Sequence, residues 1–187
     1  MEDPLHLWKA ANSFRDLCNL GARFIEGEAV GFPGWLPGEL DEESDAQAPL
    51  LARAQRAGFL TLASQPGIPP CEAADGRIEQ RRAFVFGFAE PPLAERLIRA
   101  CQSAKLWTAN HASEASGGET LTVATRGEQE FLCVGDGQGP TELELFEGAL
   151  GPGPALEALR ASRYLVLADP AWGRDDLLWP TLERSLG

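Results

Sequence analysis

The strongest indication of the fold is the stretch Arg82-Ala83-Phe84-Val85-Phe86-Gly87-Phe88-Ala89. Phe84, Phe86 and Phe88 alternate with smaller residues, and this period of two predicts a β-strand with three aromatic rings on one face. Such a face has to be buried against another layer of secondary structure. The stretch therefore predicts a sheet in the middle of the chain, with helices packed on one or both of its faces.

The residues before this strand have helical patterns. Ser13 with Asp16 three positions later resembles a capping box, and Gly27 can end the helix in the left-handed conformation. A further helical segment is expected over residues 49–57. The apolar stripe of the capped helix consists of Leu17, Leu20, Phe24 and Ile25.

From Phe59 onward the pattern alternates between strands and helices. A hairpin is expected over residues 120–134 with its turn at Arg126-Gly127, because both arms are rich in β-branched or aromatic residues. The other expected elements are strands at 59–63, 143–146 and 164–168 and helices at 92–104, 154–161 and 175–186, with long loops at 64–81 and 110–119.

This order of elements predicts an α+β fold, with N-terminal helices followed by a small mixed sheet with flanking helices. At 187 residues, the chain is expected to form a single globular domain over 1–187.

The charge excludes whole classes of partner. The chain has 28 Asp and Glu against 16 Lys and Arg, a formal net charge of −12, which repels phosphate backbones and anionic lipid. We therefore expect no nucleic-acid binding and no membrane binding. No apolar run approaches the roughly 18 residues of a membrane span, and the first residues lack the features of a signal peptide. The expected location is the cytoplasm.

The four cysteines do not suggest a metal site. Cys18, Cys71, Cys101 and Cys133 are 30 or more residues apart, without a Cys-x-x-Cys pair. Three of them lie in apolar periodic segments, where a free cysteine behaves as a small buried hydrophobe, while Cys71 lies in an expected loop. We expect neither a metal nor a cofactor.

Two stretches carry a resemblance to a known family. They are residues 56–61 running into Ser64-Gln65-Pro66-Gly67, and residues 169–180 with Trp172-Gly173-Arg174. Together with the N-terminal helix pair and Glu26-Gly27-Glu28, they resemble an uncharacterised family of similar length that is common in actinobacteria and described only as a domain of unknown function. The likeness covers most of the chain, and it implies no activity.

The same two stretches are candidate ligand-binding loops, because both follow strands. Ser64 and Gln65 could present a hydroxyl and an amide to a ligand, although Pro66-Gly67 also fits a type II turn. Arg174 could bind an anion at the end of a central strand. The alternative is structural, with Asp175 capping the last helix, Trp172 covering the edge of the core and Arg174 pairing with a carboxylate.

His111 is the histidine that falls in an expected loop. It could act as a base for Ser64 or Cys71, with Asp136 or Asp169 orienting it, or it could simply be a surface histidine. The glycine-rich residues 135–139 are interpreted as a turn, because an acidic, strand-like run follows them instead of the helix N-terminus that a nucleotide loop requires.

The acidic segment 26–45 is a candidate contact surface for a protein. It holds seven carboxylates and no basic residue, and it encloses two aromatic residues in a Gly/Pro-rich loop. An aromatic anchor in a field of one sign can steer and then hold a basic partner, whereas the alternative is a solvated charged face. The residues of this candidate surface are Phe32, Trp35, Asp41, Glu42 and Glu43.

The sequence thus supports two main hypotheses about function. The first is a small acidic cytoplasmic module that binds or neutralises a basic protein partner, in the manner of an immunity or inhibitor protein. The second is a small-molecule-binding protein or an enzyme, and a structural subunit of an oligomer is a third option. The pocket of the second hypothesis would gather Ser64, Gln65, His111, Asp169, Trp172 and Arg174.

Overall fold

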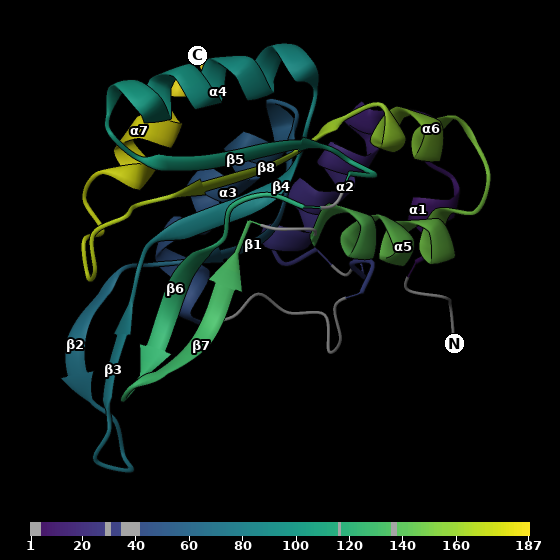
Figure 1. Cartoon of the computed structure of the whole chain (residues 1–187). Helices are drawn as coiled ribbons and strands as arrows, with labels where there is room; N and C mark the ends of the chain where they lie inside the picture. Colours follow the sequence, from purple (N-terminus) through teal and green to yellow (C-terminus); the bar gives the residue numbers. More distant parts are fainter. Residues whose placement is uncertain (1–4, 29–30, 35–41, 116, 136–137) are drawn as a thin grey trace.

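The computed structural model of the chain describes residues 5–28, 31–34, 42–115, 117–135 and 138–187 (Figure 1). Within these ranges, seven α-helices and two four-stranded antiparallel sheets make up the molecule. The expected α+β fold is therefore confirmed, with two antiparallel sheets in place of one mixed sheet. None of the described helices combines the length and the apolar character needed to cross a membrane.

The central sheet is built around the strand with three phenylalanines. Its order is β1 (Phe59–Gln65), β4 (Phe84–Ala89), β8 (Arg163–Ala168) and β5 (Trp107–Ala112), with every neighbouring pair antiparallel. All six residues of β4 are buried. As predicted, Phe84, Phe86 and Phe88 share one face, and they pack in one core cluster with Tyr164 of β8.

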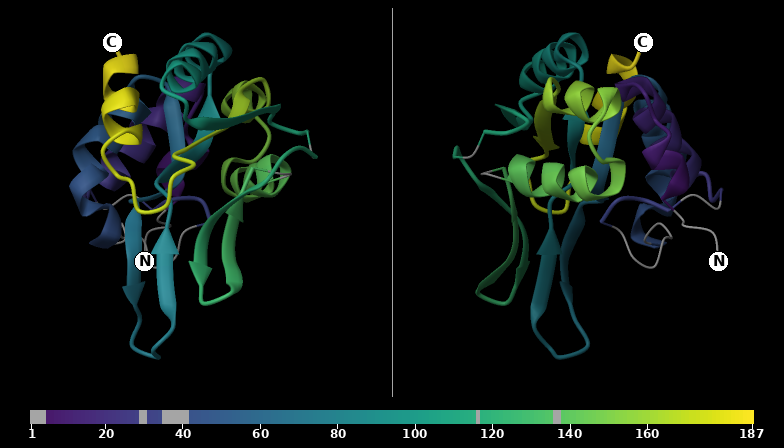
Figure 2. Two further views of the ribbon diagram at one scale, coloured as in Figure 1. Left: turned by 60° about the vertical axis from the view of Figure 1, so that its left-hand side comes forward. Right: turned by 90° about the vertical axis from the view of Figure 1, so that its right-hand side faces the viewer.

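Helices cover both faces of this central sheet (Figure 2). The phenylalanine face packs on α2 (Phe14–Ile25), α5 (Gln138–Leu150) and α6 (Pro154–Arg160), together with the short α1 (His6–Lys9). On the opposite face, Val85, Leu165 and Leu167 pack on α3 (Ala48–Arg56), α4 (Pro91–Ser103) and α7 (Leu178–Ser185).

The second sheet extends from the first. Its order is β2 (Ile68–Glu72), β3 (Ile78–Arg81), β6 (Leu121–Arg126) and β7 (Gln129–Val134). Only two residues separate β1 from β2 and two separate β3 from β4, so one long hairpin contributes two strands to each sheet. Both hairpins of the second sheet project from the helical body (Figure 2). The β6–β7 hairpin turns as predicted at Arg126-Gly127, where Gly127 has a φ of 63°.

The helix-capping prediction is also confirmed. Ser13 Oγ accepts a hydrogen bond of 3.1 Å from Asp16 N, and Asp16 Oδ2 accepts one of 3.0 Å from Asn12 N. The hydrogen bond from Asn12 N lowers the pKa of the Asp16 carboxyl, and the nearby Ser13 hydroxyl lowers it further. The helix ends before Gly27, whose φ of 77° is left-handed, as expected.

Two groups of expected elements are wrong. Residues 143–146 were expected to be a strand but lie inside α5, where Leu143, Phe146 and Ala149 are buried at a spacing of three. A helix therefore begins within the glycine-rich residues 135–139, at Gln138, while 136–137 lie outside the described residues. The expected loops at 64–81 and 110–119 contain β2, β3 and part of β5. β2 and β5 are edge strands and β3 has no buried residue, so these segments lack a clear alternating pattern.

Candidate functional site

The two loops that carry the family resemblance meet in space. Gly67 N donates a hydrogen bond of 2.8 Å to Asp175 Oδ1. Gly67 also lies against the backbone of Arg174, because a Cβ at position 67 would fall 2.3 Å from Arg174 O. The contact lies where the long hairpin passes from the first sheet to the second, and we call it the sheet junction: Gln65, Gly67, Arg82, Asp169, Trp172, Arg174 and Asp175.

The polar side chains of the sheet junction bind one another. Arg174 donates two hydrogen bonds of 2.6 Å to the Asp169 carboxylate. Asp169 is 0% exposed, and its contact with Arg174 raises the pKa of the Arg174 guanidinium. Gln65 Nε2 donates to Arg82 O at 2.9 Å and to Val123 O at 3.2 Å. These groups are satisfied by protein partners, which is the arrangement of a structural brace.

Arg82 and Asp175 extend this brace. The Arg82 guanidinium lies 3.8 Å from the centre of the Trp172 ring and donates to Pro170 O at 2.8 Å, and burial lowers the pKa of Arg82. Asp175 was expected to cap the last helix, but α7 begins at Leu178 without a side-chain cap. The Asp175 carboxylate instead accepts a bond of 2.7 Å from Trp179 Nε1.

His111 lies apart from the sheet junction. On β5 it is paired with Tyr164, whereas the end of β8 next to Asp169 is paired with Trp107. Four residues of strand, about 13 Å, separate the two positions. His111 Nε2 is buried without a hydrogen-bond partner, and its ring packs on Gly118. The predicted pocket of six residues is therefore divided among separate places.

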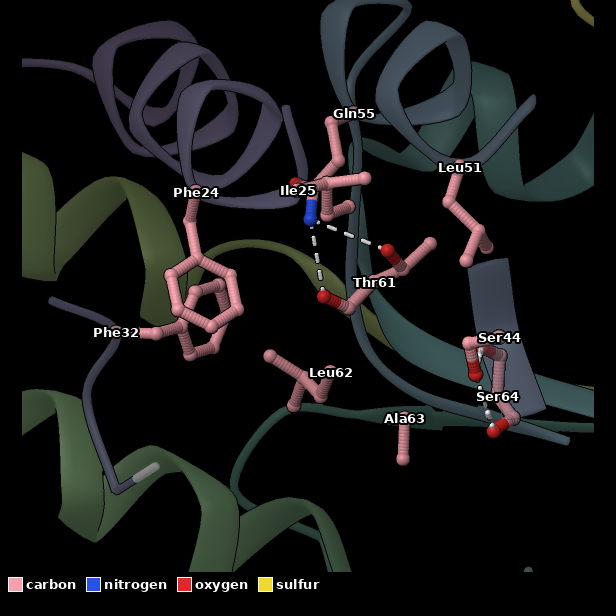
Figure 3. A pocket seen from close by; sticks show the side chains of 10 residues that line it. All are labelled: Phe24, Ile25, Phe32, Ser44, Leu51, Gln55, Thr61, Leu62, Ala63 and Ser64. Carbon is pink, nitrogen blue, oxygen red and sulfur yellow. Dashed lines mark hydrogen bonds between the residues drawn. The ribbon is translucent and has the colours of Figure 1, made fainter. Parts of the chain in front are cut away.

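Ser64 lines a cavity that the other five residues of the predicted pocket do not line (Figure 3). The cavity has a volume of about 70 Å³ and lies between α2, α3, β1 and the 3-10 helix η1 (Glu42–Gln47). It is lined by Phe24, Ile25, Phe32, Ser44, Leu51, Gln55, Thr61, Leu62, Ala63 and Ser64.

A buried amide forms the middle of the cavity wall. Gln55 is 0% exposed, and its Nε2 donates to Thr61 O at 3.0 Å and to Thr61 Oγ1 at 3.1 Å. A backbone carbonyl can only accept, so the nitrogen of the amide has to face Thr61. Gln55 Oε1 then has no hydrogen-bond partner and lies against Gly21, where an added Cβ would be 2.5 Å away.

Two serine hydroxyls form one end of the cavity. Ser44 Oγ lies 3.3 Å from Ser64 Oγ and 3.5 Å from Ser64 O. Hydroxyl hydrogen bonds are usually about 2.7–2.8 Å long, so both contacts are weak. Ser44 is 5% exposed and Ser64 is half-buried, and the weak contacts leave both hydroxyls with unused hydrogen-bonding capacity.

The opposite end of the cavity is aromatic. The rings of Phe24 and Phe32 are 5.2 Å apart between centroids, and Figure 3 shows them across the cavity from the two serines. Phe32 is 8% exposed and also contacts Trp8 and Phe146. The ring of Phe32 therefore belongs to the core and is not an exposed anchor for a protein partner.

The rest of the candidate contact surface is only partly described. Trp35 and Asp41 lie outside the described residues, and Glu42 and Glu43 are the first residues of η1. Within segment 26–45, two carboxylates are paired with arginines from outside it, Glu26 with Arg56 and Glu28 with Arg23. The acidity of this segment is therefore partly neutralised in space, which the sequence alone does not show.

The described residues of the cavity lining are uncharged. These ten residues include no Asp, Glu, Lys, Arg or His, so the described lining supplies no group for acid–base catalysis. Across the described ranges, no three His, Cys, Asp or Glu side chains are placed to hold a metal ion.

Sequence reasoning found one polar lining residue, Ser64, and missed Ser44, Gln55 and Thr61. A usable signal was present in the helix at 48–56, because Gln55 lies four residues after Leu51 and so falls on the same buried face. A polar residue on the apolar face of a helix needs a partner or a role.

Comparison with curated proteins gives no match. A family model described as "Domain of unknown function (DUF6919)" matches residues 4–187, and the chain therefore belongs to this family.

Proposed function

We propose that this domain binds a small uncharged molecule in the cavity between α2, α3 and β1. The observation that carries the proposal is the cavity itself, about 70 Å³ with a mixed lining of hydroxyl, amide and apolar groups. Protein interiors contain few voids larger than a water molecule, and those with polar walls usually hold water or a ligand.

The absence of charge among the described lining residues favours a neutral ligand. An ion in this cavity would lose its hydration without meeting an opposite charge, at a cost of several kcal/mol. A neutral ligand avoids this cost and gains from contact with Phe24, Leu51 and Leu62. The lack of titratable groups among the described lining residues favours binding over chemistry, because Ser64 has no base among them.

The size of the cavity limits what it can enclose. An apolar cavity of about 150 Å³ is large enough for benzene, so this cavity encloses a smaller group. Ile25, Leu62, Ala63 and Ser64 are half-buried and form the rim, where the remainder of a larger ligand would lie.

Titration with two probes of equal size tests this proposal. We expect sec-butanol to shift the methyl NMR signals of Leu51, Leu62 and Ala63 in a saturable way, with a Kd in the millimolar range. The sec-butylammonium ion should not shift them, because it is charged at neutral pH. Ala63→Leu should fill the cavity and abolish the response, while Ala161→Leu, at an exposed position, should not. Equal binding of both probes, or no saturable shift with sec-butanol, would refute the proposal.

A second proposal concerns the projecting sheet, where a basic protein partner could bind. Phe131 on β7 is 71% exposed, and exposed carboxylates precede it in the sequence at Glu130, directly before it, and at Glu128. Exposed aromatic residues are frequent anchors at protein interfaces. We expect a basic protein from the native host to be retained by the wild type and by Leu145→Ser, an exposed control position, but not by Phe131→Ser. Equal retention by Phe131→Ser would refute this second proposal.

A further inference from the structure

We infer that the ligand of the cavity is a small neutral alcohol whose hydroxyl group is held between Ser44 and Ser64. This inference rests on the proposed binding function and adds to it the chemical class of the ligand and the position of its polar group.

The distances within the serine pair leave room for a third oxygen. At 3.3 Å, Ser44 Oγ and Ser64 Oγ are too far apart for a strong bond and close enough for one guest oxygen to reach both at about 2.8 Å. Ser44 Oγ has an alternative acceptor in Ser64 O, but that contact is 3.5 Å long. A guest oxygen thus adds stronger hydrogen bonds to the weak contact between the two serines.

The chemistry of a hydroxyl fits this place better than that of other neutral groups. A hydroxyl donates one hydrogen bond and accepts two. With Ser44 donating to Ser64 and Ser64 donating to the guest, a guest hydroxyl can donate back to Ser44 and close a ring of three hydrogen bonds. A guest carbonyl can only accept, so the third bond is lost.

The Gln55 amide in the middle of the cavity wall does not compete for the hydroxyl group of the ligand. Both N–H groups of the Gln55 amide are directed at Thr61, through Thr61 O and Thr61 Oγ1. Gln55 Oε1 is covered by Gly21. Figure 3 shows the serines at one end and the Phe24 and Phe32 rings at the other. The hydroxyl is therefore placed at the serine end and the hydrocarbon part toward the aromatic end.

Three probes of nearly equal size test the inference: sec-butanol, butanone and sec-butyl chloride. We expect sec-butanol to bind about three- to tenfold more tightly than sec-butyl chloride, since a net hydrogen bond is worth a factor of this size. Butanone should fall between them. In the double variant Ser44→Ala/Ser64→Ala, the preference for sec-butanol should disappear while sec-butyl chloride still binds. Ser103→Ala, which alters an exposed serine on α4, should keep the preference.

The outcomes separate this inference from the function on which it rests. If sec-butanol and sec-butyl chloride bind the wild type equally, the alcohol is not the ligand class and the neutral cavity still binds. If the double variant keeps the preference, the serine pair does not hold the hydroxyl. If none of the three probes gives saturable shifts at the lining methyl groups, both the inference and the proposed function are overturned. Methyl spectra of the double variant without probe establish that it is folded.

Discussion

Gly67 and Asp175 lie 108 positions apart and are joined by a hydrogen bond of 2.8 Å from Gly67 N to Asp175 Oδ1. The same oxygen accepts from Trp179 Nε1 at 2.7 Å, so one carboxylate ties the strand connection to the last helix.

Replacing this carboxylate should destabilise the fold. Asp175→Ala leaves two partly buried donors, Gly67 N and Trp179 Nε1, without their acceptor, and we expect the free energy of unfolding to fall by about 2–3 kcal/mol. Urea denaturation measures the change. Asp176→Ala removes the neighbouring exposed carboxylate and should change the free energy of unfolding by less than about 0.5 kcal/mol. Equal effects of the two substitutions would contradict the role of Asp175.

Arg174→Ala should destabilise the fold more, because Asp169 is 0% exposed and would lose its counter-charge. Breaking a buried pair in this way costs about 3–5 kcal/mol, and the 40% exposure of the Arg174 side chain places the expected loss near the lower end. Arg174→Lys should recover only part of it, since an ammonium cannot make the two parallel bonds. Arg163→Ala is the control. If thermal unfolding shows the same loss of stability for Arg163→Ala and Arg174→Ala, the stabilising role of the Arg174–Asp169 pair is contradicted.

Gly21→Ala should destabilise α2 against the usual trend. Alanine normally stabilises a helix interior relative to glycine by roughly 0.5–1 kcal/mol, but here its Cβ would be 2.5 Å from Gln55 Oε1. We expect a loss of about 1–3 kcal/mol, and a coupling of at least about 1 kcal/mol with Gln55→Ala in a double-mutant cycle. Gly148→Ala in α5 has open space around it and should stabilise. Additive effects at positions 21 and 55 would show that the two residues do not interact.

The buried thiols should make the protein less stable in alkali. Burial raises the pKa of Cys101 from 9.0 to about 12 and raises that of Cys18 further. Above about pH 9 the unfolded chain releases these protons while the folded chain retains them, so stability should fall as the pH rises from 9 toward 12. In Cys101→Ala, the urea midpoint should fall less steeply with pH.

A thiol reagent should label exposed Cys71 first and then half-buried Cys133, which was expected to be buried. It should label Cys18 and Cys101 only on unfolding. Fast labelling of Cys101 in the folded protein would contradict its burial.

Much of the fold could be predicted because local patterns agree with the final packing. The alternating phenylalanines of β4 face one core, and Ser13 caps the helix that its spacing with Asp16 predicts. The strand β2 could not be found in this way, because Pro69 and Pro70 break its pattern and most of its residues are exposed. Only pairing with β3 makes this segment a strand.

The candidate site was less accessible to sequence reasoning. The small-molecule hypothesis requires the two resemblance loops to meet, and they do, but as a brace in which Arg174 pairs with Asp169. The cavity instead combines residues of four elements, and its serine pair joins Ser44 to Ser64 across 20 positions. Such a pair arises from tertiary packing and leaves no local pattern in the sequence.

The position of β8 has a consequence for the order in which the chain can fold. β4 and β5 are neighbours in the sequence, yet β8 lies between them in the sheet and pairs with both. During synthesis, the emerging chain therefore presents β4 and β5 with unsatisfied edges until the strand ending at Ala168 has been made. Contacts of this sequence separation slow folding, and during the interval the edges of β4 and β5 that β8 will cover stay unpaired. Unpaired strand edges can pair with other chains, so we expect this nascent chain to be prone to aggregation before β8 is made.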